Sequence, residues 1–183
     1  MKTIIAILYA HLVKRQNKKW IDNPIKWQTN TFKQLIKNAV KTEFGKNHDF
    51  ENIKSYEQYK EKVPVRDYEE LRPYIEKVVN GEKDILWPGK PLYFAKTSGT
   101  TSGAKYIPIT KESIKTHIRS ARDALLNYFL KTKNFKPLNG KHMFLQGSPE
   151  LDKKQGIYHG RLSGISAHYV PKLFLRNRKP SWT

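Results

Sequence analysis

The sequence pattern changes near Asp84, and this change constrains the fold more than any other feature. Before it, apolar residues recur at helical spacing and are separated by helix-capping signals. After it, short apolar runs at 92–95 and 106–109 enclose a segment rich in Ser, Thr and Gly. A long helical stretch and a further apolar run at 143–145 follow, and the order strand, helix, strand is typical of an α/β domain. We therefore predict an α/β fold with a helical region at 1–84 and the beginning of an α/β domain at 85–183.

Glycine and proline mark the ends of two predicted helices. Asn23 and Pro24 predict a helix start, because proline suits the first helical position. Helical spacing continues to Val40, and the helix is expected to end near Phe44-Gly45, where the glycine can take a left-handed conformation. A later helix is expected to end at Asn80-Gly81.

Two shorter helices begin at capping signals. Ser55 and Asp67 are followed three residues later by Gln58 and Glu70, as in a capping box. Pro73 removes a backbone donor, so it predicts a bend or two short pieces in the second of these helices.

The N-terminus carries an apolar stripe at 4, 5, 8 and 12, which fits one face of a helix. We expect this face to pack on the body of the protein, with contact to a membrane surface as the weaker alternative. The stripe is short, and a basic run follows it without a cleavage site, so it does not resemble a signal peptide. No stretch has the roughly 18 apolar residues of a membrane span. We expect a cytoplasmic protein that does not enter a membrane.

The helix predicted after Thr110 has an apolar stripe at three- to four-residue spacing, formed by Ile114, Ile118, Ala121, Leu125, Tyr128 and Phe129. His117 lies beside this stripe and is expected to pack there rather than to act in catalysis. The six histidines show no metal-ligand spacing, and no metal site is predicted from protein side chains.

The charge raises nucleic acid as a possible partner. The 183 residues carry 35 basic and 16 acidic groups, a net charge of +19. Residues 1–90 hold 18 basic and 12 acidic groups and mix the two signs, as solvated helix faces do. Residues 91–183 hold 17 and 4. We expect no specific nucleic-acid partner.

The absence of cysteine excludes disulfides and cysteine nucleophiles and is compatible with a reducing compartment.

The segment 96–105 reads Lys-Thr-Ser-Gly-Thr-Thr-Ser-Gly-Ala-Lys and is the strongest chemical signal. Its glycines allow tight turns in which successive backbone N–H groups can bind an anion. Its hydroxyls can add donors to phosphate oxygens, and Lys105 adds a positive charge at the exit. The segment therefore predicts a nucleotide-phosphate loop. The spacing does not match a Walker A motif or a dinucleotide fingerprint.

The run Thr97 to Thr101, with Gly103 and Lys105 after it, resembles the phosphate-binding motif of the acyl-adenylate-forming superfamily. Colinear segments along nearly the whole chain narrow this resemblance to the auxin-responsive acyl acid–amido synthetase family. These segments are 42–46, 63–65, 67–68, 73–75, the residues before Lys96, and the tail from Ser163-Gly164-Ile165 to Pro180-Ser181-Trp182.

The resemblance implies an ATP-dependent ligase that activates a carboxylic acid as an acyl-adenylate and transfers it to an amino acid amine. It implies ATP and Mg²⁺ as cofactors and small-molecule acids and amino acids as partners. No covalent intermediate and no catalytic side chain in this part of the chain are implied. The residues that match the phosphate loop are Ser98, Gly99, Thr100, Thr101, Gly103 and Lys105.

The chain is shorter than the family pattern, since the later adenine, ribose and lid segments are absent. We therefore expect an N-terminal fragment without the C-terminal lid domain and without activity alone. The family places part of its acyl pocket at 156–170, where Tyr158, Ser163 or Tyr169 could line the pocket; His159 and His168 also fall in this segment. Strand packing is the more expected role for it. The alternatives that stay open are an acyl-CoA ligase, a basic nucleic-acid-binding protein and an interaction module.

Overall fold

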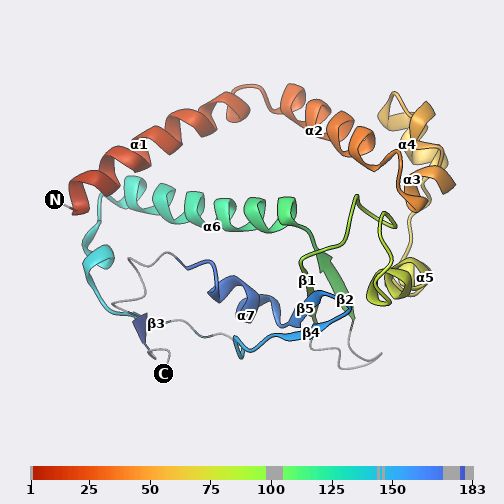
Figure 1. The fold of residues 1–183 in the computed structure, drawn as a ribbon. Helices are drawn as coiled ribbons and strands as arrows, with labels where there is room; N and C mark the ends of the chain where they lie inside the picture. The colour runs from red at the N-terminus through yellow and green to blue at the C-terminus, as the bar shows by residue number, and fades with distance from the viewer. Residues whose placement is uncertain (1, 98–104, 144, 146, 171–177, 180–183) are drawn as a thin grey trace. The chain divides into compact units, whose positions relative to one another are not determined.

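The computed structural model describes residues 2–97, 105–143, 145, 147–170 and 178–179 (Figure 1). A helical N-terminal part is followed by mixed strands and helices, which confirms the predicted fold class. The α-helices are α1 Lys2–Ile21, α2 Pro24–Ala39, α3 Glu43–Asn47, α4 Tyr56–Lys62, α5 Tyr68–Val79, α6 Lys111–Thr132 and α7 Leu162–Ala167, and the 3₁₀ helices are η1 Phe50–Asn52 and η2 Lys136–Asn139. The strands are β1 Tyr93–Lys96, β2 Tyr106–Ile109, β3 His142–Met143, β4 Asp152–Lys154, β5 Ile157–Gly160 and β6 Arg178–Lys179.

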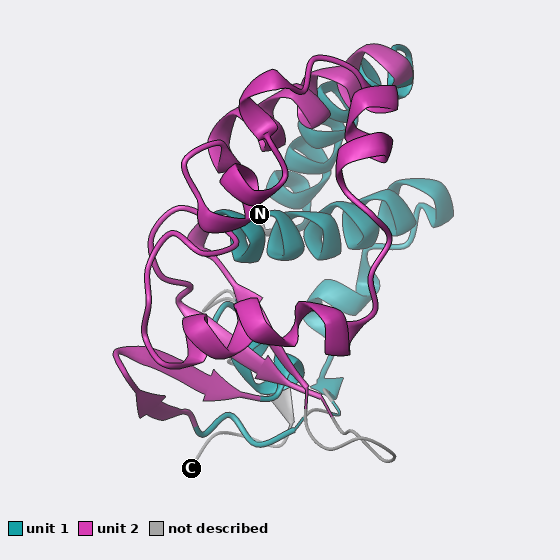
Figure 2. Ribbon diagram, turned by 90° about the vertical axis from the view of Figure 1, so that its right-hand side faces the viewer, with its two compact units in different colours: residues 1–24, 112–150, 161–183 teal, residues 25–111, 151–160 magenta. Residues whose placement is uncertain are grey.

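The chain forms two compact units that alternate along the sequence (Figure 2). Unit 1 contains residues 1–24, 112–150 and 161–183, and unit 2 contains residues 25–111 and 151–160. The predicted domain division between residues 84 and 85 is a different kind of boundary and stays a prediction.

Unit 2 contains a four-stranded mixed sheet in the order β2-β1-β5-β4. β2 and β4 run antiparallel to their neighbours, whereas β1 and β5 are parallel, with Phe94 opposite His159. β2 is an edge strand, as Pro108 predicts, because proline cannot donate to a ladder. β4 and β5 form a hairpin across Gln155 and Gly156, whose φ values of 50° and 81° fit a type I′ turn.

Helix α5 packs its apolar side against this sheet. Ile75 and Val78 of α5 form a buried cluster with Phe94 of β1, Ile157 of β5 and Ile85. Phe94 and Ile157 are fully buried, so the helix and the two parallel strands form the centre of this core.

The N-caps predicted at Ser55 and Asp67 are present. The Ser55 hydroxyl accepts from the Gln58 N–H at 3.2 Å, although the Gln58 side chain returns to the Lys54 N–H and not to Ser55. Asp67 and Glu70 form the complete capping box of α5. The other end of α5 closes at a left-handed Gly81, whose N–H donates to the Val78 carbonyl.

The prediction that α2 ends at Gly45 is wrong. α2 ends at Ala39, and Thr42 caps the separate helix α3 by accepting from the Gly45 N–H at 3.0 Å. Gly45 lies buried inside α3 and does not have a positive φ. An added Cβ there would lie 2.0 Å from the Ala39 carbonyl oxygen. Glycine is therefore needed at this position because the backbone at Ala39 comes too close for a side chain.

The division into two short pieces predicted as one outcome at Pro73 is wrong, since α5 continues through it, and a bend there stays a prediction. Proline at this position removes only the hydrogen bond to the carbonyl of residue 69, in the exposed first turn. The buried residues Ile75 and Val78 hold the following turns on the sheet.

In unit 1, α1 packs against α6 through small and medium apolar residues. Ala10 and Val13 of α1 form a buried cluster with Leu126 and Phe129 of α6. The stripe predicted to pack on the body instead faces outward: Ile4, Ile5, Leu8 and Leu12 are more than half exposed. The buried face of α1 is therefore the opposite one.

The predicted stripe of α6 is correct only in part. Ile114 and Phe129 are buried, but Ala121, Leu125 and Tyr128 are exposed, and Leu126 takes the buried place. His117 is exposed, so its predicted packing role is wrong. The face is shifted because α6 buries the residues that meet Ala10 and Val13.

The strand predicted at 143–145 is β3, His142–Met143, which pairs in parallel with β6. Phe144 lies outside the described residues, and Leu145 is not in a strand.

Candidate functional site

The candidate site is the end of the sheet where β1 ends at Lys96 and β2 begins at Tyr106 (Figure 1). β1 and β5 are parallel, so their carboxyl ends meet at this edge. Open α/β sheets bind ligands outside the carboxyl ends of their strands. Thr97 and Lys105, the two described ends of the predicted phosphate loop, lie at the carboxyl end of β1, where this rule expects a ligand.

Two hydrogen bonds close the base of the loop. The Thr97 N–H donates to the Lys105 carbonyl at 3.0 Å, and the Lys105 N–H donates to the Thr97 hydroxyl at 3.2 Å. They continue the β1–β2 ladder one step beyond its last strand pair, Lys96 and Tyr106. Thr97 and Lys105 are therefore fixed at the two ends of the loop.

Lys105 is the one predicted site residue that falls in the described part of the chain. The others, Ser98, Gly99, Thr100, Thr101 and Gly103, lie outside it, and their contacts with phosphate stay a prediction. The Lys105 ammonium lies over the Tyr68 ring, 5.2 Å from its centroid, in a cation–π arrangement.

Tyr68 is a site neighbour that the sequence reasoning missed. Its hydroxyl accepts from the Tyr106 N–H at 2.8 Å, directly after Lys105 in the chain. The Asp67 capping box was a signal that fixed Tyr68 at the start of a helix. No pattern in the sequence linked it to residues 38 positions away, because that contact is made by tertiary packing.

His159 of β5 lies on the face of the sheet that α5 covers, near the carboxyl ends of β1 and β5. Its ring is 5.2 Å from Phe94 and 5.8 Å from Tyr106, measured between ring centroids. Its Nε2 atom is buried and has no hydrogen-bond partner among the described residues. Burial lowers the pKa of His159 below its ordinary value, and the positive charge of Lys154 lowers it further, against a smaller opposing effect of Asp152.

We expect His159 to make stability depend on pH. Because its pKa is lower in the folded chain than in the unfolded chain, protonation favours unfolding. Its contribution is fully present above the unfolded pKa, near 6.5, and is lost as the pH falls below that value. Urea midpoints measured between pH 7.5 and 5 should therefore fall less in His159→Gln than in the original chain. His117→Gln, at an exposed histidine of α6, is the control and should keep the original slope; equal slopes in all three proteins would contradict the assignment.

Three other residues of the segment 156–170, Tyr158, Ser163 and His168, have local partners. Tyr158 lies on the opposite face of the sheet in ring contact with Tyr93, and Lys153 lies over it at 5.1 Å. In unit 1, the Ser163 hydroxyl accepts from the Gly147 N–H at 2.9 Å, and a His168 ring nitrogen lies 2.8 Å from the Pro149 carbonyl. The role of this segment in an acyl pocket stays a prediction.

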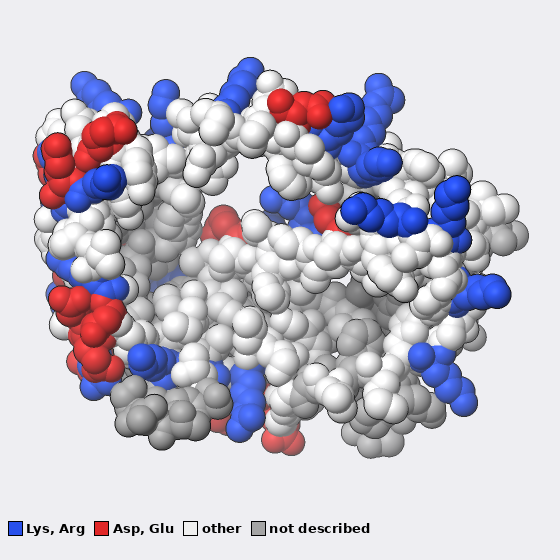
Figure 3. Space-filling view, turned by 180° about the vertical axis from the view of Figure 1, so that it is seen from behind, with Lys and Arg blue, Asp and Glu red and all other residues white. Residues whose placement is uncertain are grey.

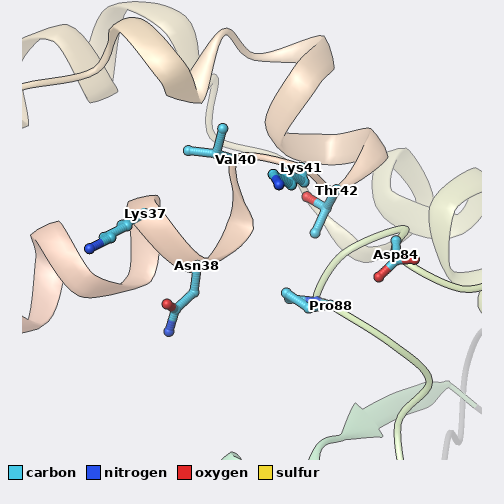
Figure 4. Close-up of a pocket in the computed structure, with 7 residues that line it drawn as sticks. All are labelled: Lys37, Asn38, Val40, Lys41, Thr42, Asp84 and Pro88. Atoms are coloured by element: carbon cyan, nitrogen blue, oxygen red, sulfur yellow. The ribbon is translucent and has the colours of Figure 1, made fainter.

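A depression of about 480 Å³ in unit 2 is lined by Lys37, Asn38, Val40, Lys41, Thr42, Asp84 and Pro88 (Figure 4). Its polar groups hold the local backbone: the Thr42 hydroxyl donates to the Ala39 carbonyl, and Asp84 accepts from the Gly89 N–H at 2.7 Å. None of the described residues that line it belongs to the segment 97–105. We therefore do not assign it to the phosphate site.

Basic side chains do not form a single stripe on the face seen in Figure 3, where Lys and Arg occur at many separate places and acidic groups lie among them.

Within the described ranges, no group of three or more His, Cys, Asp or Glu could hold a metal ion. The helices of that part of the chain include none that is long and apolar enough to cross a membrane.

Comparisons with known proteins agree with the resemblance seen in the sequence. Residues 13–178 match the model of the GH3 family N-terminal domain. The chain is 27% identical over 133 residues to the jasmonoyl-L-amino acid synthetase GH3.5 of Oryza sativa subsp. japonica, and 29% identical over 130 residues to the probable indole-3-acetic acid-amido synthetase GH3.13 of the same plant. These alignments cover 71% and 68% of this chain but 22% and 26% of the two relatives, so the chain spans about a quarter of their length.

The fold also matches a solved relative. The structure of the GH3.15 acyl acid amido synthetase superposes with a TM-score of 0.69 at 23% identity, over 91% of this chain and 28% of that one. The family model covers most of the residues that make up both compact units. The chain therefore belongs to the GH3 family, whose N-terminal domain model matches its residues 13–178.

Proposed function

We propose that this chain supplies the phosphate-binding part of an ATP-dependent ligase that joins a small carboxylic acid to an amino acid. In the first step the carboxylate attacks the α-phosphate of ATP, and pyrophosphate leaves. In the second step the amine attacks the resulting acyl-adenylate, and AMP leaves. Membership of the GH3 family supports this proposal, since the named relatives are synthetases of jasmonoyl–amino acid conjugates and amido synthetases of indole-3-acetic acid. We infer a cytoplasmic location, where ATP is available.

The observation that carries the proposal is the position of Thr97 and Lys105, the two ends of the segment 97–105. They lie at the carboxyl end of β1, which is parallel to β5, and two hydrogen bonds join them. The sequence between them holds two glycines and several hydroxyl side chains, which are the kind of donors that a triphosphate needs.

The residues of the loop would act by holding and neutralising the triphosphate. The hydroxyls of Ser98, Thr100 and Thr101 and the backbone N–H groups of the loop would donate to phosphate oxygens, at roughly 1.5–3 kcal/mol for each bond to a charged group. Lys105 would place one positive charge at the exit. Mg²⁺ would enter with ATP, because this ion is usually held by substrate phosphates, waters and only one or two carboxylates. Fixing the α-phosphate for in-line attack is the contribution we assign to this part of the enzyme.

An ATP derivative with an acyl group on its γ-phosphate tests this role directly, because it transfers the acyl group to a lysine amine beside the bound phosphates. Mass spectrometry of the labelled chain should find Lys105 modified in preference to the exposed lysines, and millimolar ATP should suppress this. The double variant Ser98→Ala, Thr101→Val should lower labelling at Lys105 at least tenfold, or about 1.4 kcal/mol.

Ser120→Ala is the matched control, since this hydroxyl lies on α6 and donates to the Thr116 carbonyl at 3.0 Å. It should leave the labelling of Lys105 unchanged. Labelling of Lys105 that matches the exposed lysines and does not respond to ATP would refute the phosphate site.

A further inference from the structure

Tyr68 is held rigidly at the first position of α5. The Asp67 side chain accepts from the Glu70 N–H at 2.9 Å, and the Glu70 carboxylate accepts from the Asp67 N–H at 2.8 Å. The Tyr68 ring packs against the cluster that joins α5 to the sheet. Both the backbone and the ring of Tyr68 are therefore fixed before any ligand binds.

The hydroxyl of Tyr68 meets the outer side of β2. β2 is the edge strand of the sheet, so the backbone groups of Tyr106 that point away from β1 have no strand to pair with. The Tyr68 hydroxyl accepts from the Tyr106 N–H at 2.8 Å and lies 3.5 Å from the Tyr106 carbonyl oxygen, to which it can donate. A side chain from α5 thus pairs with the edge at the residue where the loop ends.

The ring of Tyr68 meets the side chain of the preceding residue. The Lys105 ammonium lies 5.2 Å from the ring centroid, within cation–π range. Lys105 is also bonded to the residue that follows β1, because its backbone N–H and carbonyl both bond to Thr97. The same tyrosine therefore holds the backbone after Lys105 through its hydroxyl and the Lys105 side chain through its ring.

We propose that Tyr68 is a positioning residue that orients Lys105 toward the nucleotide phosphates. This inference rests on the proposed function of the segment 97–105. Free lysine side chains sample many rotamers, so a ring beneath the ammonium group and a fixed strand start restrict Lys105 to one side of the loop exit. Tyr68 touches no substrate atom in this scheme and acts only through Lys105 and Tyr106.

Two variants separate the hydrogen bond between Tyr68 and Tyr106 from the contact between the Tyr68 ring and Lys105. NMR spectra of both variants are recorded first without nucleotide. Tyr68→Phe removes the hydroxyl and keeps the ring, so the Tyr106 amide should exchange its hydrogen with solvent at least tenfold faster by NMR. Tyr68→Leu removes the ring too, so the NMR signal of isotopically methylated Lys105 should lose its ring-current shift. Tyr74→Phe on the same helix is the control, since the Tyr74 hydroxyl bonds to Asn47 and not to β2. It should change neither signal.

Labelling of Lys105 by the acyl-phosphate derivative of ATP then tests the consequence for function. Tyr68→Phe should lower the labelling rate at saturating probe about threefold and Tyr68→Leu tenfold or more, with a smaller change in the half-saturating concentration. A residue that only stabilised the fold would lower labelling in proportion to the unfolded fraction, which circular dichroism measures in the same samples.

The failures are distinguishable. ATP-suppressed labelling that is equal in the original chain and both Tyr68 variants would overturn this inference and leave the proposed function standing. Absence of ATP-suppressed labelling in the original chain would overturn both. Unchanged exchange at Tyr106 in Tyr68→Phe would overturn the hydrogen-bonding part of the argument, whatever the nucleotide does.

Discussion

Replacing Gly45 with alanine is expected to unfold the chain or to lower its stability by about 3 kcal/mol or more. The new Cβ would lie 2.0 Å from the Ala39 carbonyl oxygen and 2.9 Å from the Ala39 carbonyl carbon. Both are backbone atoms, so no flexible side chain can move aside. The same carbonyl accepts hydrogen bonds from the Thr42 N–H at 3.0 Å and the Thr42 hydroxyl at 2.7 Å, and a shift of the backbone would break them.

The effect should spread from α3 to the rest of unit 2. The Glu43 N–H donates to the Asp84 carbonyl at 2.7 Å, and the Phe44 N–H donates to the Ile85 carbonyl at 2.9 Å. Ile85 belongs to the core that joins α5 to the sheet. Natural domains are stable by only about 5–15 kcal/mol, so a loss of this size is a large part of the total.

Urea unfolding followed by circular dichroism measures this loss. Gly140→Ala is the matched control, because its Cβ would come no closer than 3.5 Å to another atom, an ordinary contact. Its midpoint should stay close to that of the original chain. A Gly45→Ala chain with an unchanged midpoint would show that the α2–α3 junction can relax at little cost.

Features fixed by neighbouring residues in the chain were predictable. The caps at Ser55 and Asp67, the start of α2 at Pro24 and the left-handed Gly81 all depend on hydrogen bonds or φ preferences within a few residues. The edge position of β2 followed from Pro108, which lacks a donor. These are local rules, and the structure obeys them.

Features fixed by distant partners were not predictable in the same way. Gly45 fits a helix end by its type, yet its conformation is set by contact with Ala39. On α1, the helical spacing of the apolar residues gave the period but not the buried face. Ala10 and Val13 are smaller than the residues of the exposed stripe, and small side chains allow α1 to pack against α6. A periodic pattern therefore needs its partner surface before the buried side can be assigned.

The residues of the candidate site likewise fall into a group that local sequence reveals and a group that only tertiary packing brings together. Lys105 and the loop around it could be found from the sequence, because hydroxyls, glycines and a lysine in one short segment carry their own chemical signal. Tyr68 and His159 could not be linked to that site, since the sheet and α5 bring them to Tyr106 across 38 and 53 positions of the chain. The acidic and basic residues of β4 also gave no strand signal, although Gln155-Gly156 offers a hairpin turn.

Residues 1–183 by themselves are expected to show no acid-dependent exchange of pyrophosphate into ATP. The loop offers contacts to phosphate, whereas adenylate formation also needs the base, the ribose and the carboxylic acid to be held in one geometry. The chain spans about a quarter of the relatives it matches, and the orientation of reactants can account for roughly 7–11 kcal/mol of a barrier. Loss of even half of that orientation would slow the reaction more than a hundredfold.

The measurement is the incorporation of labelled pyrophosphate into ATP in the presence of a panel of carboxylic acids that includes indole-3-acetic acid. A full-length GH3 synthetase serves as the positive control under the same conditions. ATP-suppressed labelling of Lys105 should persist in the chain that shows no exchange, because holding phosphate and orienting it for attack are separate tasks. Robust acid-dependent exchange by residues 1–183 would mean that this domain alone holds the acid and the nucleotide in register, and the division of tasks proposed for it would be wrong.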